Sequence, residues 1–194
     1  MKQLLVAFLA VIMFAPIAAQ AQASAWSSDG VHSSVMYTVR HAVTPMIGMF
    51  KKFDITVNWD AANPTASSID AKLDASSVMM GMDKLEQHLQ SADFFDVAKF
   101  PEWTFVSTSI VKGKKSKTTA VNYIANGKLT VHGVTKDIAV PFQFLGLLEN
   151  PRGNTAGFSA EFTINRLDYG VGQAGEMLGS DVKVNVLLEM HPKK

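Results

Sequence analysis

The chain contains no cysteine among its 194 residues. Disulfide bonds and thiolate chemistry are therefore excluded, and stability outside the cytoplasm must come from the packed core alone. A bacterial lipoprotein carries its lipid on a cysteine at the N-terminus of the processed chain. The absence of cysteine therefore also excludes that form of membrane anchoring.

The chain also lacks a large excess of charge of either sign. Its 18 Lys and Arg residues stand against 17 Asp and Glu residues, and the first 23 residues hold a single charged side chain, that of Lys2. Without that segment the charges balance at zero, which argues against partners that need a basic stripe or patch, such as nucleic acid or anionic lipid. The lysine-rich segment 112–117 is interpreted as a solvated hairpin tip.

Signatures of catalysis are missing as well. The sequence has no Gly-x-Ser-x-Gly elbow and no His-Glu-x-x-His motif, and no nucleophile is paired with a base at a recognisable spacing. We therefore predict no catalytic residues. An enzyme without a recognisable site signature stays as one alternative reading.

Methionines and histidines offer a second alternative, a periplasmic copper carrier. Met46, Met49 and the methionines of segment 79–82 are thioethers, which select Cu(I). However, methionine is equally a filler of irregular gaps in a core, and the sequence has no His-x-His motif. We therefore predict no metal site.

The N-terminus has the three parts of a cleavable signal peptide. Lys2 supplies a positive charge, Leu4 to Ala19 are almost wholly apolar, and small residues surround Gln20 and Gln22. The apolar run is shorter than the roughly 20 residues that cross a bilayer, which argues against a membrane anchor. We predict cleavage after Ala23, with Ala21 as the alternative, export to the periplasm, and one domain over residues 24–194.

Apolar and polar residues alternate along much of that domain. The alternation is clear over residues 53–59, 69–74, 103–106, 121–131, 158–164 and 182–189. A period of two gives each strand one apolar and one wet face, and turn signals separate the runs. This pattern predicts an all-β fold of about eight antiparallel strands, closed into a barrel or folded as a sandwich. One segment, 82–91, has apolar residues at helical spacing.

Several short motifs follow one another along the domain. They are DGVHSS at 29–34, VRH at 39–41, GMFKKF at 48–53, HLQSADFFDV at 88–97, FPEWTF at 100–105, GKLTVHGVTK at 127–136 and NRLDYG at 165–170. In content and order they resemble the YceI-like family of bacterial periplasmic proteins. The resemblance covers essentially the whole of residues 24–194.

The resemblance implies a single lipocalin-like antiparallel β-barrel with a short helical segment, in which a long apolar ligand is held. The expected ligand is a polyisoprenoid, an isoprenoid quinone or a similar long-chain lipid, with no cofactor required for activity. Some family members are encoded beside, or fused to, a cytochrome b561-type membrane protein, which makes such an inner-membrane protein a candidate partner. The sequence allows a homodimer and does not identify the cargo.

The alternating pattern also predicts which residues would line the cavity. A polyprenyl chain needs a long, dry tunnel with aliphatic and aromatic walls, since each buried methylene-sized group is worth roughly 0.8 kcal/mol. An inward apolar residue of a barrel is more often plain core than ligand wall. The predicted ligand-binding residues are Tyr37, His41, Phe53, Ile55, Val57, Ile69, Leu73, Phe95, Trp103, Phe105, Tyr123, Leu129, Phe142, Phe144, Phe158, Phe162, Val184 and Val186.

Four histidines lie within the motifs and are candidates to contact a polar head group: His32, His41, His88 and His132. His41 shares its parity with Val35, Tyr37 and Val39 and is expected to point inward. Satisfying backbone groups at strand ends is the alternative role for all four. Phe94 and Phe95 are expected to plug one end of the barrel.

Overall fold

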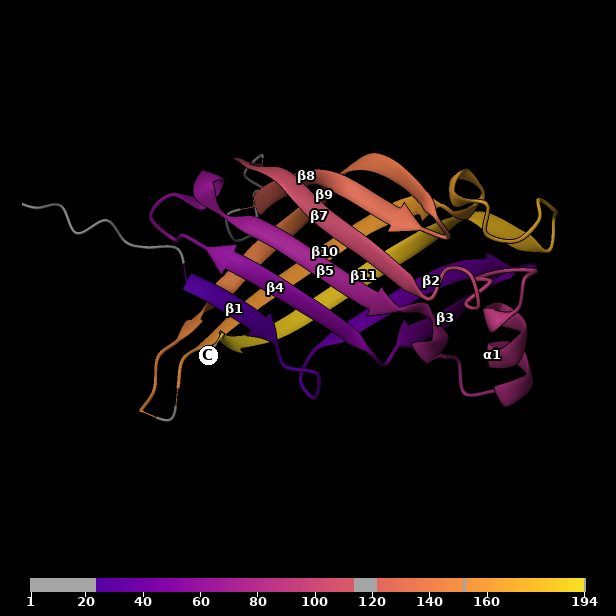
Figure 1. Cartoon of the computed structure of the whole chain (residues 1–194), viewed down its shortest axis with the longest axis horizontal. Helices are drawn as coiled ribbons and strands as arrows, with labels where there is room; N and C mark the ends of the chain where they lie inside the picture. The colour runs from indigo at the N-terminus through magenta and orange to yellow at the C-terminus, as the bar shows by residue number, and fades with distance from the viewer. Residues whose placement is uncertain (1–23, 114–121, 152, 194) are drawn as a thin grey trace, which may run out of the picture.

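The computed structural model describes residues 24–113, 122–151 and 153–193 (Figure 1). The predicted signal peptide lies outside these residues, as does the segment 114–117 of the lysine-rich tip. The strands are β1 (Ser24–Ser28), β2 (Ser34–His41), β3 (Thr44–Phe50), β4 (Phe53–Trp59), β5 (Ser68–Asp74), β6 (Val78–Met79), β7 (Glu102–Lys112), β8 (Asn122–Val131), β9 (Val134–Leu148), β10 (Thr155–Asn165) and β11 (Leu178–Pro192).

Eight of these strands close into a barrel. Each strand pairs with the next in the order β1-β4-β5-β7-β8-β9-β10-β11, and β11 returns to β1. All of these pairings are antiparallel, which confirms the predicted all-β barrel of about eight strands with a short helical segment. From Leu178 to Leu187, β11 pairs on that side with β2 instead of β1, and β3 and β6 extend the sheet beyond β2.

The strands form where the sequence alternates. In β4, Ile55, Val57 and Trp59 are buried while Asn58 is exposed, as the period of two predicts. The turn from β8 to β9 consists of His132 and Gly133, with φ of 51° and 75°. Two positive φ values in a two-residue hairpin match the right-handed twist of the flanking strands, so this dipeptide sets the register of the pair.

Helix α1 (Asp83–Gln90) confirms the helix predicted at 82–91 and lies at one end of the barrel (Figure 1). The Glu86 carboxylate accepts hydrogen bonds from the backbone N–H groups of Met80 (2.7 Å) and Gly81 (2.9 Å), which ties the helix to β6. The chain then turns back rather than forming a second helix, because Phe95 N donates to Leu89 O at 2.9 Å. Within the described ranges, no helix has the length and apolarity to cross a membrane.

Two short 3₁₀ turns flank β5 (Pro64–Ala66 and Ala75–Ser77), and a third follows β10 (Arg166–Tyr169). The core is one apolar cluster that runs along the inside of the barrel. At the end away from α1 it is dominated by Trp59, whose ring lies 5.2–6.2 Å from four other aromatic rings, those of Tyr123, Phe142, Phe144 and Phe158.

Candidate functional site

The barrel encloses an apolar cavity of about 440 Å³. This volume lies within the range of small-molecule binding sites. Its wall takes residues from every barrel strand except β1, together with β2, β3 and α1. An eight-stranded barrel is just wide enough either to fill its interior with side chains or to hold one small ligand, and here part of the interior is open.

With two exceptions, the predicted ligand-binding residues lie around the cavity. All of them line the cavity apart from Tyr123 and Phe144, which belong to the aromatic group around Trp59. Alternation reports which face of a strand a residue occupies, but not how far along the barrel the open volume reaches. At the Trp59 end the volume is filled by rings, so an inward residue there is core.

Further residues that were not among the predicted ligand-binding residues also line the cavity. They include Phe50, Leu85, Leu89, Phe94, Val131, Val140, Ala160, Ile164, Val171, Leu178 and Leu188. The helical spacing of Leu85 and Leu89 was a usable signal, since it marks the face of α1 that must cover something apolar. Strand residues such as Val131, Ala160 and Leu188 share the parity of the predicted residues, so alternation could have found them. Phe94 and Val171 lie outside the strands, and nothing local predicts that they reach the cavity.

A chain of aromatic rings lines the cavity near α1. The ring centroids of Tyr37 and Phe50 are 5.5 Å apart, those of Phe50 and Trp103 are 5.3 Å apart, and those of Phe95 and Trp103 are 4.8 Å apart. Phe95, one of the two predicted plug residues, is buried here, and its neighbour Phe94 packs edge-on against His88. A Cβ on Gly48 would fall 2.3 Å from the Tyr37 ring, so glycine is needed for that ring to lie where it does.

Two hydrogen-bond donors in this aromatic wall have no partner among the described residues. They are the Tyr37 hydroxyl and the Trp103 indole N–H, and both atoms are buried. Burial, with a smaller contribution from the charge of Glu86, raises the pKa of Tyr37 well above its ordinary value, so the hydroxyl stays protonated. Buried polar groups normally have partners, so these two donors are suited to an acceptor on a bound molecule.

Histidines and methionines around the mouth are placed differently from one another. His41 and His88 line the cavity, whereas His32 is exposed at the β1–β2 turn and His132 packs on Phe100 in a hairpin. Met46 and Met80 also line the cavity, Met49 pairs with Met79 across β3 and β6, and Met82 is exposed. The thioethers are thus distributed over the mouth rather than gathered at one point.

Arg166 holds the loop beside the mouth and is only 4% exposed. Its guanidinium donates to the carbonyl oxygens of Val171 (2.7 Å), Gly179 (2.8 Å), Gln173 (2.9 Å) and Leu178 (3.1 Å). Burial lowers the pKa of Arg166. Asp168 does not neutralise the charge of Arg166, since the Asp168 carboxylate faces Lys136 Nζ at 3.6 Å. The buried charge is satisfied by backbone dipoles, which order residues 171–179.

A closed antiparallel barrel around an apolar cavity, with a short helix over one end, defines the class of this protein. The family model for the YceI-like domain matches residues 26–190. A UPF0312 protein of Pseudomonas putida strain F1 is 38% identical over 174 residues, which cover 86% of this chain and 88% of the relative. The chain therefore belongs to the YceI-like family.

Solved structures agree with this assignment. Burkholderia cenocepacia BcnA superposes with a TM-score of 0.73 at 25% identity, covering 84% of this chain and 98% of BcnA. A polyisoprenoid binding domain from Saccharophagus degradans, implicated in plant cell wall breakdown, superposes with a TM-score of 0.62. The superposition covers 88% of this chain and 99% of the domain at 14% identity, so it supports the fold assignment alone.

Proposed function

We propose that this protein is a periplasmic carrier that holds a long-chain apolar ligand, such as a polyisoprenoid or an isoprenoid quinone, inside its barrel. The observation that carries the proposal is the cavity, whose lining is almost wholly aliphatic and aromatic. Each methylene-sized group that enters it contributes roughly 0.8 kcal/mol, so a chain of several such groups suffices for stable binding.

The two unpartnered donors narrow the chemistry of the ligand. Tyr37 and Trp103 both pack on Phe50, and both lack an acceptor within the described residues. A ligand with a carbonyl or hydroxyl oxygen at one end of an apolar chain would satisfy them. A quinone head has such oxygens, whereas a pure hydrocarbon has none. The Saccharophagus domain of the same fold is a polyisoprenoid binding domain, and a polyisoprenoid belongs to the same class of long apolar chains.

Binding rather than catalysis is the proposed activity. The titratable side chains in the wall, including those of His41, Lys72, His88 and Arg166, are distributed over separate strands and the helix. Arg166 is already committed to backbone carbonyls. Export would place the carrier in an aqueous compartment that a long isoprenoid cannot cross unaided, and an inner-membrane protein of the cytochrome b561 type is the proposed recipient.

Native mass spectrometry of the protein, followed by organic extraction, tests the ligand. We expect a bound lipid after purification from a quinone-replete host. The matched pair of variants is Ala160→Phe, which fills the cavity, and Ala139→Phe, which places the same ring on the outer face of β9. Loading should be lost in the first and kept in the second. Recovery of empty wild-type protein, or equal loading of both variants, would refute the proposal.

Localisation has its own test. Fractionation of cells that express the full chain, with N-terminal sequencing of the purified product, should find the protein in the periplasm beginning at Ser24, or at Gln22 for the alternative cleavage. An intact N-terminus in the cytoplasmic fraction would contradict the proposed setting.

A further inference from the structure

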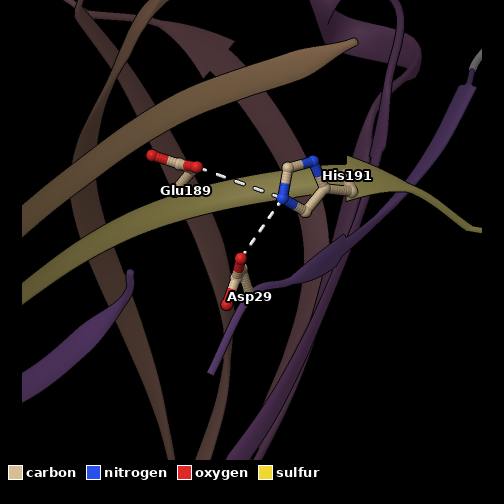
Figure 2. Close-up of side chains that lie close together, drawn as sticks. All are labelled: Asp29, Glu189 and His191. Atoms are coloured by element: carbon tan, nitrogen blue, oxygen red, sulfur yellow. Dashed lines mark hydrogen bonds and ion pairs between the residues drawn. The ribbon is translucent and has the colours of Figure 1, made fainter. Parts of the chain in front are cut away.

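A second group of chemically reactive side chains lies outside the cavity, where the β1–β2 turn meets β11 (Figure 2). Asp29 is in the turn, and Glu189 and His191 are two residues apart on β11. Residues i and i+2 of a strand point to the same face, so both β11 side chains face the turn. His32, at the other side of the turn, reaches the same carboxylate. None of the four lines the apolar cavity.

The ring nitrogens of the two histidines converge on one oxygen atom. His32 Nδ1 lies 2.9 Å from Asp29 Oδ2, and His191 Nε2 lies 3.2 Å from the same atom. Glu189 Oε1 is 3.9 Å from His32 Nδ1 and 4.0 Å from His191 Nε2, too far for a hydrogen bond to either. Direct hydrogen bonding therefore explains the position of Asp29 but leaves that of Glu189 unexplained.

These separations suit ligands that share one metal ion. Zinc bonds of roughly 2.0–2.2 Å in tetrahedral geometry put neighbouring ligand atoms roughly 3.3–3.6 Å apart. The distance from Asp29 Oδ2 to His191 Nε2 (3.2 Å) is just below that range, and the distance from Glu189 Oε1 to His191 Nε2 (4.0 Å) is above it. One oxygen or nitrogen from each of Asp29, Glu189 and His191 fits within a mutual separation of 4.8 Å, so small side-chain shifts bring all three to one ion. We propose that Asp29, Glu189 and His191 bind a divalent transition-metal ion of the zinc class, with the fourth position open to water.

The hydrogen-bond partners of His191 are compatible with a metal on its Nε2 atom. Its other ring nitrogen, Nδ1, faces the Asn154 carbonyl oxygen at 3.4 Å and the Thr155 hydroxyl at 3.5 Å. In one neutral tautomer Nε2–H donates to Asp29 and Nδ1 accepts from the Thr155 hydroxyl. In the other, Nδ1–H donates to the Asn154 carbonyl and Nε2 presents its lone pair to the Asp29 carboxylate, which is the form that binds a metal. Two acceptors 3.2 Å apart repel unless a cation lies beside them, either a proton on the ring or a metal ion. Metal-bound histidines usually have such a carbonyl partner on the second nitrogen.

The backbone holds this group in place without the metal. Asp29 N donates to Glu189 O at 2.9 Å, and the Ser33 hydroxyl both donates to Glu189 O (3.0 Å) and accepts from Glu189 N (3.1 Å). Val31 N donates to Asp29 Oδ1 at 2.7 Å, which leaves Oδ2 directed at the histidines. Because the ligands are already positioned, little conformational entropy is lost when an ion binds.

The location suggests what the metal would do. The barrel is closed by the pairing of β1 with β11, which has only three residue pairs, from Trp26–Pro192 to Ser28–Met190. The β10–β11 pairing has ten. Of the proposed ligands, Asp29 follows β1 directly, Glu189 lies just beyond the seam on β11, and His191 pairs with Ser27 inside it. An ion there would join the two sides of the seam and resist opening of the barrel.

Zinc titration of the untagged protein, after treatment with EDTA, tests the site. We expect one Zn²⁺ per chain by calorimetry, no comparable binding of Mg²⁺, and a rise in melting temperature with Zn²⁺, because an ion that binds only the folded state stabilises it. His191→Ala should weaken zinc binding at least tenfold and remove the rise in melting temperature. If that variant does not fold, Glu189→Gln keeps the size of the side chain and tests the same site.

Glu161→Gln is the matched control, because Glu161 lies on the neighbouring strand β10 and pairs with Lys183 Nζ at 2.9 Å. It should bind zinc as the wild type does. Absence of zinc binding by the wild type, or zinc affinity unchanged in both His191→Ala and Glu189→Gln, would overturn the proposal. Neither result bears on lipid loading, which is measured separately.

Discussion

The two ends of the barrel are closed in different ways. Away from α1, the interior is filled by the Trp59 ring and its aromatic neighbours, and no open volume reaches Tyr123 or Phe144. At the α1 end, the aromatic wall of Tyr37, Phe50 and Trp103 leaves space, and the cover is a short helix without a fully buried residue. The filled end favours stability, whereas the α1 end keeps open volume inside the barrel.

The largest effect is expected at the filled end. Trp59→Ala should lower the free energy of unfolding by about 3–5 kcal/mol, because a large buried side chain is lost and a void remains among the rings. Urea denaturation followed by circular dichroism measures this. Trp59→Phe, which keeps a ring in the cluster, should lose markedly less. Equal losses in the two variants would show that ring packing does not close this end.

At the α1 end, Arg166 should matter most for stability. Arg166→Met removes the buried guanidinium, so four backbone carbonyl oxygens lose their hydrogen-bond donor. We therefore expect a loss of about 2–3 kcal/mol in the free energy of unfolding. Arg40→Met is the control, because Arg40 is exposed and donates only to the carbonyls of Ala42 and Glu176. Its loss should stay below about 1 kcal/mol. Similar losses in both would show that the buried guanidinium has no special role.

The aromatic wall offers a sharper comparison, between empty and loaded protein. Tyr37→Phe removes a buried hydroxyl without a partner, so the empty protein should be as stable as the wild type or slightly more stable. A ligand with an acceptor oxygen should bind about 2–10-fold more weakly, which corresponds to one hydrogen bond of about 0.5–1.5 kcal/mol. A hydrocarbon of similar length should bind equally to both proteins. Competition against a fluorescent fatty ligand measures the difference.

The smallest effect concerns the attachment of α1 in acid. Hydrogen bonds from the backbone N–H groups of Met80 and Gly81 lower the pKa of Glu86. A carboxyl group whose pKa is lowered by folding stabilises the fold above its unfolded pKa, and this contribution is lost as pH falls through the folded value. Hydrogen exchange of the α1 amides should therefore speed up in acid relative to the rest of the barrel.

Glu86→Gln should remove that acid dependence, whereas Asp83→Asn, at the exposed start of the same helix, should keep it. An acid response unchanged in Glu86→Gln would mean that another group controls the helix.

Much of the fold follows from the sequence, because alternation is a local property. The β4 pattern, the helix near 82–91 and the His132–Gly133 turn were all predictable from neighbouring residues. The wall of the cavity followed in the same way, since parity assigns each strand residue to one face. The extent of the cavity did not follow, because it depends on where rings from β4, β8, β9 and β10 meet around Trp59.

The sequence by itself determined the strand periodicity and the apolar inner face, both of which can be read within a few residues. Only the tertiary structure decided which contacts form between distant segments. Asp29 and His191 are 162 positions apart, and their side chains come within 3.2 Å because closure of the barrel brings β11 back beside β1. Tyr37 and Trp103 likewise become unpartnered donors in one wall only after the strands have curled around a common interior.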